Sequence, residues 1–181
     1  FDGSQWVEIT DEYVFGIHDN EQHGFTLMMD VLPPAQISAP MYLVGKKTDA
    51  WHILLDKERK IRIRAGGGHP LEITTKRTLP KSTFSTVSIS YWEHDGYGLA
   101  EVCVNGEMDT ITPGIEGGVN FPHTDQPLVI GGFDAVGDID EIAGFSGTLD
   151  NLSIWGRAVS HQETMKLAGR DLSGREIRLN A

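Results

Sequence analysis

The 181-residue sequence has a single cysteine, few basic residues and no long hydrophobic run. Because Cys103 is the only cysteine, no disulfide can form within the chain. No apolar segment approaches the ~18 residues that a membrane-spanning helix needs. The sequence begins inside what reads as a strand, so we expect a fragment of a larger protein.

The shortage of positive charge narrows the class of partner. Lys and Arg total 15 against 26 Asp and Glu, which gives a formal net charge of -11. Nucleic acids and anionic membranes bind proteins through basic surfaces, with release of counterions. We therefore expect no nucleic acid partner and no membrane insertion.

Helical periodicity is also absent until about residue 160. Short segments rich in β-branched and aromatic residues follow one another, separated by turn residues. Residues 61–64 alternate Ile with Arg, so one face of that strand meets water. Residues 25–32 are apolar on both faces until Asp30, as in a strand covered on both sides. The expected strands are 6–10, 25–32, 41–46, 51–56, 60–64, 71–75, 83–92, 99–105, 127–130 and 148–156.

Many short strands without intervening helices predict an all-β fold. Antiparallel sheets of this kind pack as a two-sheet β-sandwich or jelly roll. No internal repeat, low-complexity tract or linker divides the chain, so residues 1–181 are expected to form a single domain.

One short C-terminal helix near 160–168 is predicted. Ser160 and Glu163 have the spacing of a capping box, and Gly169 suits a left-handed helix stop. A helix of about two turns is not stable alone, so it must dock on the sandwich. Met165 and Leu167 are expected to cover the preceding strand.

Alternation in that last strand places Leu152 and Ile154 on one face and Leu149 and Trp155 on the other. Asp150 has the parity of Leu152, so its carboxylate is expected to face the core. There it would accept backbone amides or pair with a basic side chain. A structural calcium is the alternative.

The order of these segments resembles the laminin-G-like, concanavalin A-like lectin jelly-roll domains of the pentraxin-type superfamily. The closing stretch FSGTLDNLSIWGRAVSHQE is its most specific part. "VNGE" around Asn105 and Gly106 matches the family hairpin, whose turn needs positive φ at both residues. The matching segments are FDGSQWVEI, FTLMMDVLPP, YLVGKKTDAWHILLDKERKIRIR, SISYWEHDGYGLAEVCVNGE, PLVIGG and the closing stretch, in which Phe145, Gly147, Leu149, Asp150, Trp155, Arg157 and Ser160 match.

The resemblance implies a sandwich that is extracellular, on the cell surface or periplasmic, binds glycans or proteins, and often holds calcium. It does not by itself imply catalysis. In this family the first strand pairs with the last, so Arg157 is expected to be the partner of Asp2.

The acidic loop GGFDAVGDIDEIAGF, residues 131–145, suggests calcium as a cofactor. Carboxylates crowd a glycine-bounded segment after PLVIGG, where the calcium ligands of pentraxin-like relatives cluster. Their repulsion is costly unless the loop is solvated or a cation lies among them, and calcium prefers such oxygen ligands. A solvated acidic loop is the alternative, because the spacing is not that of an EF-hand and Gly132 and Phe133 occupy the first places. The candidate metal ligands are Asp134, Asp138, Asp140 and Glu141.

"DIDEI" also invites comparison with laminarinase-type glycoside hydrolases. Their catalytic carboxylates alternate along one strand face. Asp138 and Asp140 share a face here, but Glu141 points away unless a β-bulge realigns it. Cys103 shares a face with Glu101 and has no histidine near it in sequence, so an ordinary unpaired thiol is predicted. The seven histidines show no close metal-ligand spacing.

Sugar sites combine flat apolar surface with fixed polar groups. Trp51 and His52 offer one such combination, and two loops offer others. The candidate ligand-binding residues are Trp92, His94 and Tyr97 around one hairpin turn and Phe121, His123 and Asp125 before PLVIGG.

The sequence thus predicts a noncatalytic recognition module with carbohydrate as the ligand. Calcium is a candidate component of the binding site, and a solvated acidic loop is the alternative. A protein-binding adhesion or assembly module and a polysaccharide-cleaving enzyme are the alternatives.

Overall fold

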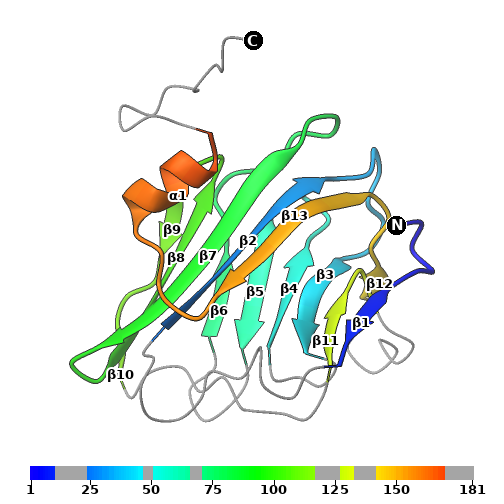
Figure 1. Ribbon diagram of the computed structural model, residues 1–181. Coiled ribbons are helices and arrows are strands. Elements are labelled where there is room, and N and C mark those ends of the chain that lie inside the picture. Colours follow the sequence, from blue (N-terminus) through cyan, green and yellow to red (C-terminus); the bar gives the residue numbers. More distant parts are fainter. Residues whose placement is uncertain (11–23, 47–50, 66–70, 117–126, 133–141, 170–181) are drawn as a thin grey trace.

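Two antiparallel β-sheets packed face to face form the body of the protein (Figure 1). The computed structural model describes residues 1–10, 24–46, 51–65, 71–116, 127–132 and 142–169. The seven-stranded sheet has the order β1-β11-β3-β4-β5-β6, and β12 pairs in parallel with β3. The six-stranded sheet has the order β10-β8-β7-β2-β13, and β9 pairs with β8. This is the predicted all-β sandwich.

The helix and strands have the following bounds. Helix α1 spans His161–Leu167. The strands are Val7–Ile9 (β1), Gly24–Leu32 (β2), Met41–Lys46 (β3), Trp51–Leu55 (β4), Ile61–Ala65 (β5), Leu71–Thr74 (β6), Ser85–His94 (β7), Tyr97–Val104 (β8), Glu107–Ile111 (β9), Ile115–Glu116 (β10), Leu128–Ile130 (β11), Ala143–Gly144 (β12) and Thr148–Trp155 (β13).

The ten predicted strands are confirmed, each with bounds within two residues of those expected. The sequence prediction missed β9, β10 and β12. Strands β10 and β12 have only two residues each, too few to show a period. Of the five residues of β9 only Asp109 is buried, so this strand lacks the apolar face on which the pattern argument relies.

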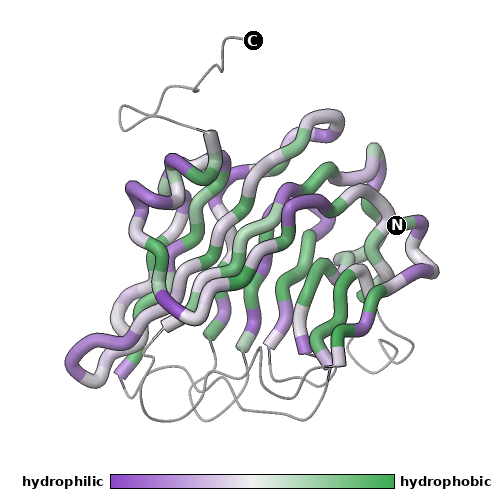
Figure 2. The backbone as a smooth tube through the Cα atoms, in the orientation of Figure 1, coloured by the Kyte–Doolittle hydropathy of each residue, from purple (hydrophilic) through white to green (hydrophobic). Residues whose placement is uncertain are grey.

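Alternate residues of both sheets form one hydrophobic core. Leu27 and Met29 of β2 and Ile89 of β7 meet Ile53 and Ile63 from the other sheet. The hydropathy colours change along the strands as this alternation requires (Figure 2). The opposite face of β2 and β7 is therefore the outer face of the six-stranded sheet, and α1 lies over it (Figure 1).

Helix α1 begins at the predicted capping box. The Ser160 Oγ accepts a hydrogen bond from the Glu163 amide, and the Glu163 carboxylate accepts one from the Ser160 amide. Gly169 follows the helix with a φ of 72°, the left-handed conformation expected of it. Within the described residues, no helix is long and apolar enough to cross a membrane.

A ring of buried hydrogen bonds docks the turn before α1 onto the sheet. The Val159 amide donates to Thr26 Oγ1 at 2.7 Å, and Ser90 Oγ donates to the Val159 carbonyl at 3.2 Å. Thr26 Oγ1 and Ser90 Oγ are 2.9 Å apart. Because the one hydroxyl hydrogen of Ser90 goes to Val159, Thr26 donates to Ser90, which closes the ring. This ring fixes the start of α1 over β2 and β7.

The prediction that Asp150 faces the core is wrong. The pairing of β13 with β2 shifts register between Asp150 and Ser153, where Asn151 has a φ of 51°. The extra residue of this β-bulge reverses the parity, so Leu149 packs against the core together with Leu152 and Ile154. Asp150 is exposed, and its Oδ1 accepts from the Asn151 amide at 2.8 Å.

The predicted pairing of Asp2 with Arg157 is also wrong, because β1 pairs with β11 and not with β13. The Asp2 carboxylate accepts hydrogen bonds from Ser4, which lower its pKa. The Arg157 guanidinium donates to both carboxylate oxygens of Glu163, at 3.2 and 2.9 Å. That contact, together with the Ser160 hydrogen bonds, lowers the pKa of Glu163 to about 2.

We predict that Ser160→Ala destabilises the protein by about 1 kcal/mol, because the Glu163 amide loses its capping acceptor. For a chain of this length the melting temperature should fall by roughly 2–4 °C. Thermal unfolding followed by circular dichroism measures the change. Ser82→Ala, at an exposed serine in a turn, is the matched control and should leave the melting temperature unchanged. Equal melting temperatures for the two variants would contradict the capping role.

Candidate functional site

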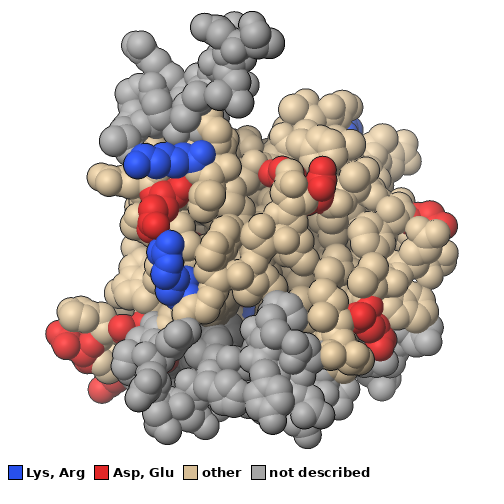
Figure 3. Space-filling model, viewed as in Figure 1, with Lys and Arg blue, Asp and Glu red and all other residues tan. Residues whose placement is uncertain are grey.

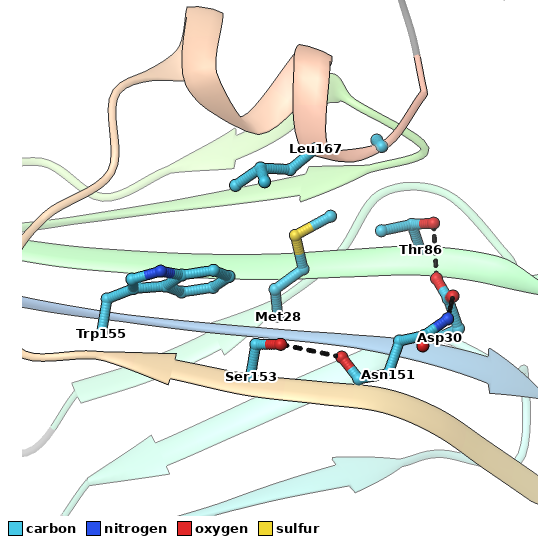
Figure 4. Close-up of a pocket in the computed structure, with 8 residues that line it drawn as sticks. Met28, Asp30, Thr86, Asn151, Ser153, Trp155 and Leu167 are labelled. Carbon is cyan, nitrogen blue, oxygen red and sulfur yellow. Dashed lines mark hydrogen bonds between the residues drawn. The ribbon is translucent and has the colours of Figure 1, made fainter.

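A hollow of about 300 Å³ opens on the outer face of the six-stranded sheet, beside α1 (Figure 4). Met28 and Asp30 of β2 have the opposite parity to the core residues Leu27 and Met29, and they form its floor. Asn151, Ser153 and Trp155 of β13, Thr86 of β7 and Leu167 of α1 form its walls. Three strands and the docked helix therefore build one concave surface.

One end of the hollow is polar and held by hydrogen bonds. Asp30 Oδ1 accepts from Thr86 Oγ1 at 2.6 Å, and Asp30 Oδ2 accepts from Asn151 Nδ2 at 2.8 Å. The Ser153 hydroxyl donates to the Asn151 carbonyl at 3.3 Å. A carboxylate oxygen can accept more than one hydrogen bond, and an amide group carries two hydrogens. Asp30 and Asn151 are thus fixed in place and still able to bind a ligand.

The other end of the hollow is apolar. Trp155 is half-buried, Met28 is buried beneath the centre of the hollow, and Leu167 reaches over it from α1 (Figure 4). Leu167 keeps 51% of its surface exposed, so the helix covers the last strand only in part. Of the predicted pair, Leu167 does lie over this part of the sheet, and Met165 is half-buried. The hollow therefore suits a ligand with one flat apolar face and several hydrogen-bonding groups.

The β-bulge is what brings Asn151 into this site. A residue with positive φ is rare outside glycine and asparagine, and it turns the strand locally. Here it allows the amide of an exposed residue to reach the carboxylate of Asp30 on the neighbouring strand. Sequence parity could not show this, because the extra residue interrupts the period.

The predicted hairpin residues lie on the same outer face but away from the hollow. His94 and Tyr97 pair across the β7–β8 hairpin and are exposed, and Trp92 is half-buried. His94 is eight residues, roughly 26 Å, from Thr86 along β7, but Trp155 at the other end of the hollow is level with Ser90, only four residues or roughly 13 Å along the strand from His94. The hairpin therefore lies beyond the Trp155 end of the hollow and does not line it.

The other residues proposed from the sequence to bind a ligand or a metal do not line the hollow or lie outside the described residues. Trp51 is 8% exposed and packs on Phe25, with ring centroids 6.4 Å apart, so it is a core residue and not a sugar platform. His52 is buried as well. The remaining candidates lie outside the described residues: Phe121, His123, Asp125, Asp134, Asp138, Asp140 and Glu141.

Cys103 has a neighbour that sequence spacing could not reveal. His161, the first residue of α1, places Nδ1 3.5 Å from Cys103 Sγ and 3.3 Å from Glu101 Oε1. Cys103 Sγ itself is 3.0 Å from Glu101 Oε1. Burial, with a smaller contribution from Glu101, raises the pKa of the Cys103 thiol. The thiol is free, as predicted, but it has a histidine beside it in space.

Comparison with known protein families identifies the superfamily of this chain. A model of the Concanavalin A-like lectin/glucanases superfamily matches residues 1–164, and the chain belongs to this family. Among curated protein sequences, none matches the chain. The resemblance seen in the sequence is confirmed.

Solved structures with a similar fold include three from different organisms. Domain 4 of AbnA, a GH43 extracellular arabinanase of Geobacillus stearothermophilus in complex with arabinotriose, is 16% identical with a TM-score of 0.62, over 93% of this chain and 74% of that one. The CBM40 of the Ruminococcus gnavus IT-sialidase bound to α2,3 sialyllactose is 14% identical with a TM-score of 0.63, over 82% and 84%. The SAP-like pentraxin of Limulus polyphemus is 14% identical with a TM-score of 0.57, over 86% and 75%. At these identities the likeness concerns the fold.

Two substitutions at Asn151 separate the backbone of the bulge from its side chain. Asn151→Gly removes the amide but accepts the positive φ, whereas Asn151→Ala removes the amide and strains the backbone. We predict that both lower the free energy of unfolding, Ala by about 1 kcal/mol more than Gly. Urea unfolding of the two variants measures the difference. Equal free energies of unfolding for the Ala and Gly variants would contradict the view that the positive φ at residue 151 strains an alanine there.

Proposed function

We propose that this protein is a noncatalytic recognition module that binds carbohydrate in the hollow beside α1. The observation that carries the proposal is the pairing of the Trp155 ring at one end with the hydrogen-bonded Asp30 and Asn151 at the other. A pyranose or furanose ring has the matching chemistry. Its C–H face is apolar and its edge carries hydroxyls.

The binding mechanism relies on preorganised groups. A sugar ring stacks on Trp155 while its hydroxyls donate to Asp30 and accept from Asn151. Thr86 and Asn151 already hold the carboxylate, so little side-chain freedom is lost on binding. A hydrogen bond to a charged group contributes about 1.5–3 kcal/mol, so Asp30 should account for roughly a tenfold to hundredfold difference in affinity.

The charge of the site favours neutral glycans. Asp30 is the one charged side chain among the described residues that line the hollow. On the face shown in Figure 3, basic and acidic side chains lie together over α1, where Arg157 pairs with Glu163, and most of the remaining described surface is uncharged. A sugar carboxylate placed beside Asp30 would be repelled, which disfavours anionic sugars.

Similar structures support the ligand class. Domain 4 of AbnA was solved with arabinotriose and the CBM40 of the IT-sialidase with sialyllactose. The parent of the first is described as extracellular. We extend glycan binding and an extracellular, cell-surface or periplasmic location to this chain on that basis.

The hollow itself is not arranged for glycoside hydrolysis. Glycosidases commonly flank the scissile bond with two carboxylates, and the described lining supplies only Asp30. The laminarinase-type alternative would need Asp138, Asp140 and Glu141, which lie outside the described residues. We therefore propose recognition, and not catalysis, as the function of the hollow.

Trp155→Ala should abolish detectable binding on an array of neutral glycans, because the stacking surface is lost. The matched control is Trp6→Ala, since Trp6 is 38% exposed and adjoins β1 in the other sheet. The control should bind as the unaltered protein does. Binding that survives Trp155→Ala but is lost in His94→Ala or Tyr97→Ala would assign the sugar to the hairpin. Absence of any glycan signal would favour a protein partner.

Calcium binding by Asp134, Asp138, Asp140 and Glu141 is a separate part of the proposal, supported by the sequence pattern. A ligand that binds only the folded state stabilises it, by about 2.7 kcal/mol at a hundredfold excess over its dissociation constant. Millimolar calcium should therefore raise the melting temperature. The increase should disappear in the double variant Asp138→Asn, Asp140→Asn and on addition of chelator. If calcium did not raise the melting temperature of the unaltered protein, the calcium proposal would be wrong.

A further inference from the structure

Three side chains with different metal-binding atoms converge where α1 meets β8. Glu101 and Cys103 are two residues apart on β8 and share its outer face, and His161 is the first residue of α1. One ligand atom of each lies within 4.8 Å of the others. His161 and Cys103 are 58 residues apart in sequence, so only the docking of α1 brings them together.

The spacing of these atoms fits a tetrahedral metal centre. Zinc bonds of about 2.3 Å to sulfur and about 2.0 Å to nitrogen and oxygen, at tetrahedral angles, separate S from N by about 3.5 Å and N from O by about 3.3 Å. The observed separations are 3.5 Å for Cys103 Sγ to His161 Nδ1 and 3.3 Å for His161 Nδ1 to Glu101 Oε1. The third separation, from Cys103 Sγ to Glu101 Oε1, is 3.0 Å, and a metal would widen it by about 0.5 Å.

The same geometry argues against a nucleophilic triad. A Cys–His–acid triad uses both ring nitrogens, one facing the thiol and the other facing the acid. Here Cys103 and Glu101 both face His161 Nδ1. The imidazole therefore cannot relay a proton between them, but one nitrogen, one sulfur and one oxygen can all point at a single ion.

We propose that Glu101, Cys103 and His161 bind a zinc-class divalent ion. The mixed sulfur, nitrogen and oxygen set selects zinc over calcium, which takes oxygen ligands. Cys103 is 2% exposed, whereas the His161 side chain is 33% exposed, so an ion enters from the His161 side. The fourth position faces that side and takes water or a ligand atom.

The bound ion links α1 to β8. Helix α1 has only seven residues and forms one wall of the hollow, so a metal bond at its first residue holds that wall in place. The metal site shares no residue with the hollow or with the acidic loop, so it can be tested without a glycan.

Cobalt(II) titration of the purified, reduced protein tests the site. Because Cys103 is the only cysteine, a thiolate-to-cobalt charge-transfer band reports on this residue alone. We expect one equivalent of cobalt to give that band with the visible d–d bands of tetrahedral coordination. Zinc should displace it, and millimolar calcium should leave it unchanged.

Variants at the two more accessible ligands complete the test. His161→Ala and Glu101→Gln should each weaken cobalt binding at least tenfold, since even loss of a second-shell partner costs on the order of tenfold. His94→Ala, at an exposed histidine on the same face, is the control and should retain full affinity. Zinc should raise the melting temperature of the unaltered protein but not that of His161→Ala. Absence of the thiolate band, or unchanged affinity in His161→Ala, would overturn the proposal.

Discussion

The ring of hydrogen bonds among Thr26, Ser90 and Val159 is the contact on which the functional surfaces depend. The ring is buried and joins β2, β7 and the turn before α1. Because water cannot replace the partners of these buried groups, breaking the ring would be costly, and the ring therefore sets the position of the helix. Gly24 permits the close approach of this turn, because a Cβ there would lie only 3.2 Å from the Ala158 nitrogen. From this anchored start, α1 presents His161 to β8 and Leu167 to the hollow. One short helix, too small to be stable alone, thus contributes to two candidate sites.

The architecture was predictable because its signals are local and periodic. The alternation of Ile61 and Ile63 with Arg62 and Arg64 predicted a strand with one wet face, and the structure buries the isoleucines while leaving Arg64 exposed. The capping box at Ser160 was predictable for the same reason, since its partners are three residues apart. The orientation of Asp150 was not predictable, because one extra residue in β13 reverses a two-residue period without altering composition. The family habit of pairing the first strand with the last was likewise misleading for Asp2.

The candidate sites depend on contacts between distant segments, which a single sequence does not contain. Asp30 was visible only as the residue that ends an apolar run, and its partner Asn151 is 121 residues away. Trp155 was placed on the face opposite Leu152 and Ile154, but strand alternation alone does not show that this face is hollow. Cys103 and Glu101 were correctly placed on one face, but His161 joins them only through the docking of α1. The two aromatic segments favoured from the sequence stay predictions. The hairpin at Trp92, His94 and Tyr97 does not line the hollow, and Phe121, His123 and Asp125 lie outside the described residues.

The central claim is that a sugar ring stacks on Trp155, and the indole N–H signals of the four tryptophans test it most directly. In ¹H–¹⁵N spectra recorded during titration with a neutral oligosaccharide that the protein binds, the account predicts a saturable shift of the Trp155 signal. The signal of Trp51, which is buried in the core, and that of Trp6, in the other sheet, should not move. A saturable shift of the Trp92 signal with Trp155 unchanged would contradict the account and place the ligand at the hairpin.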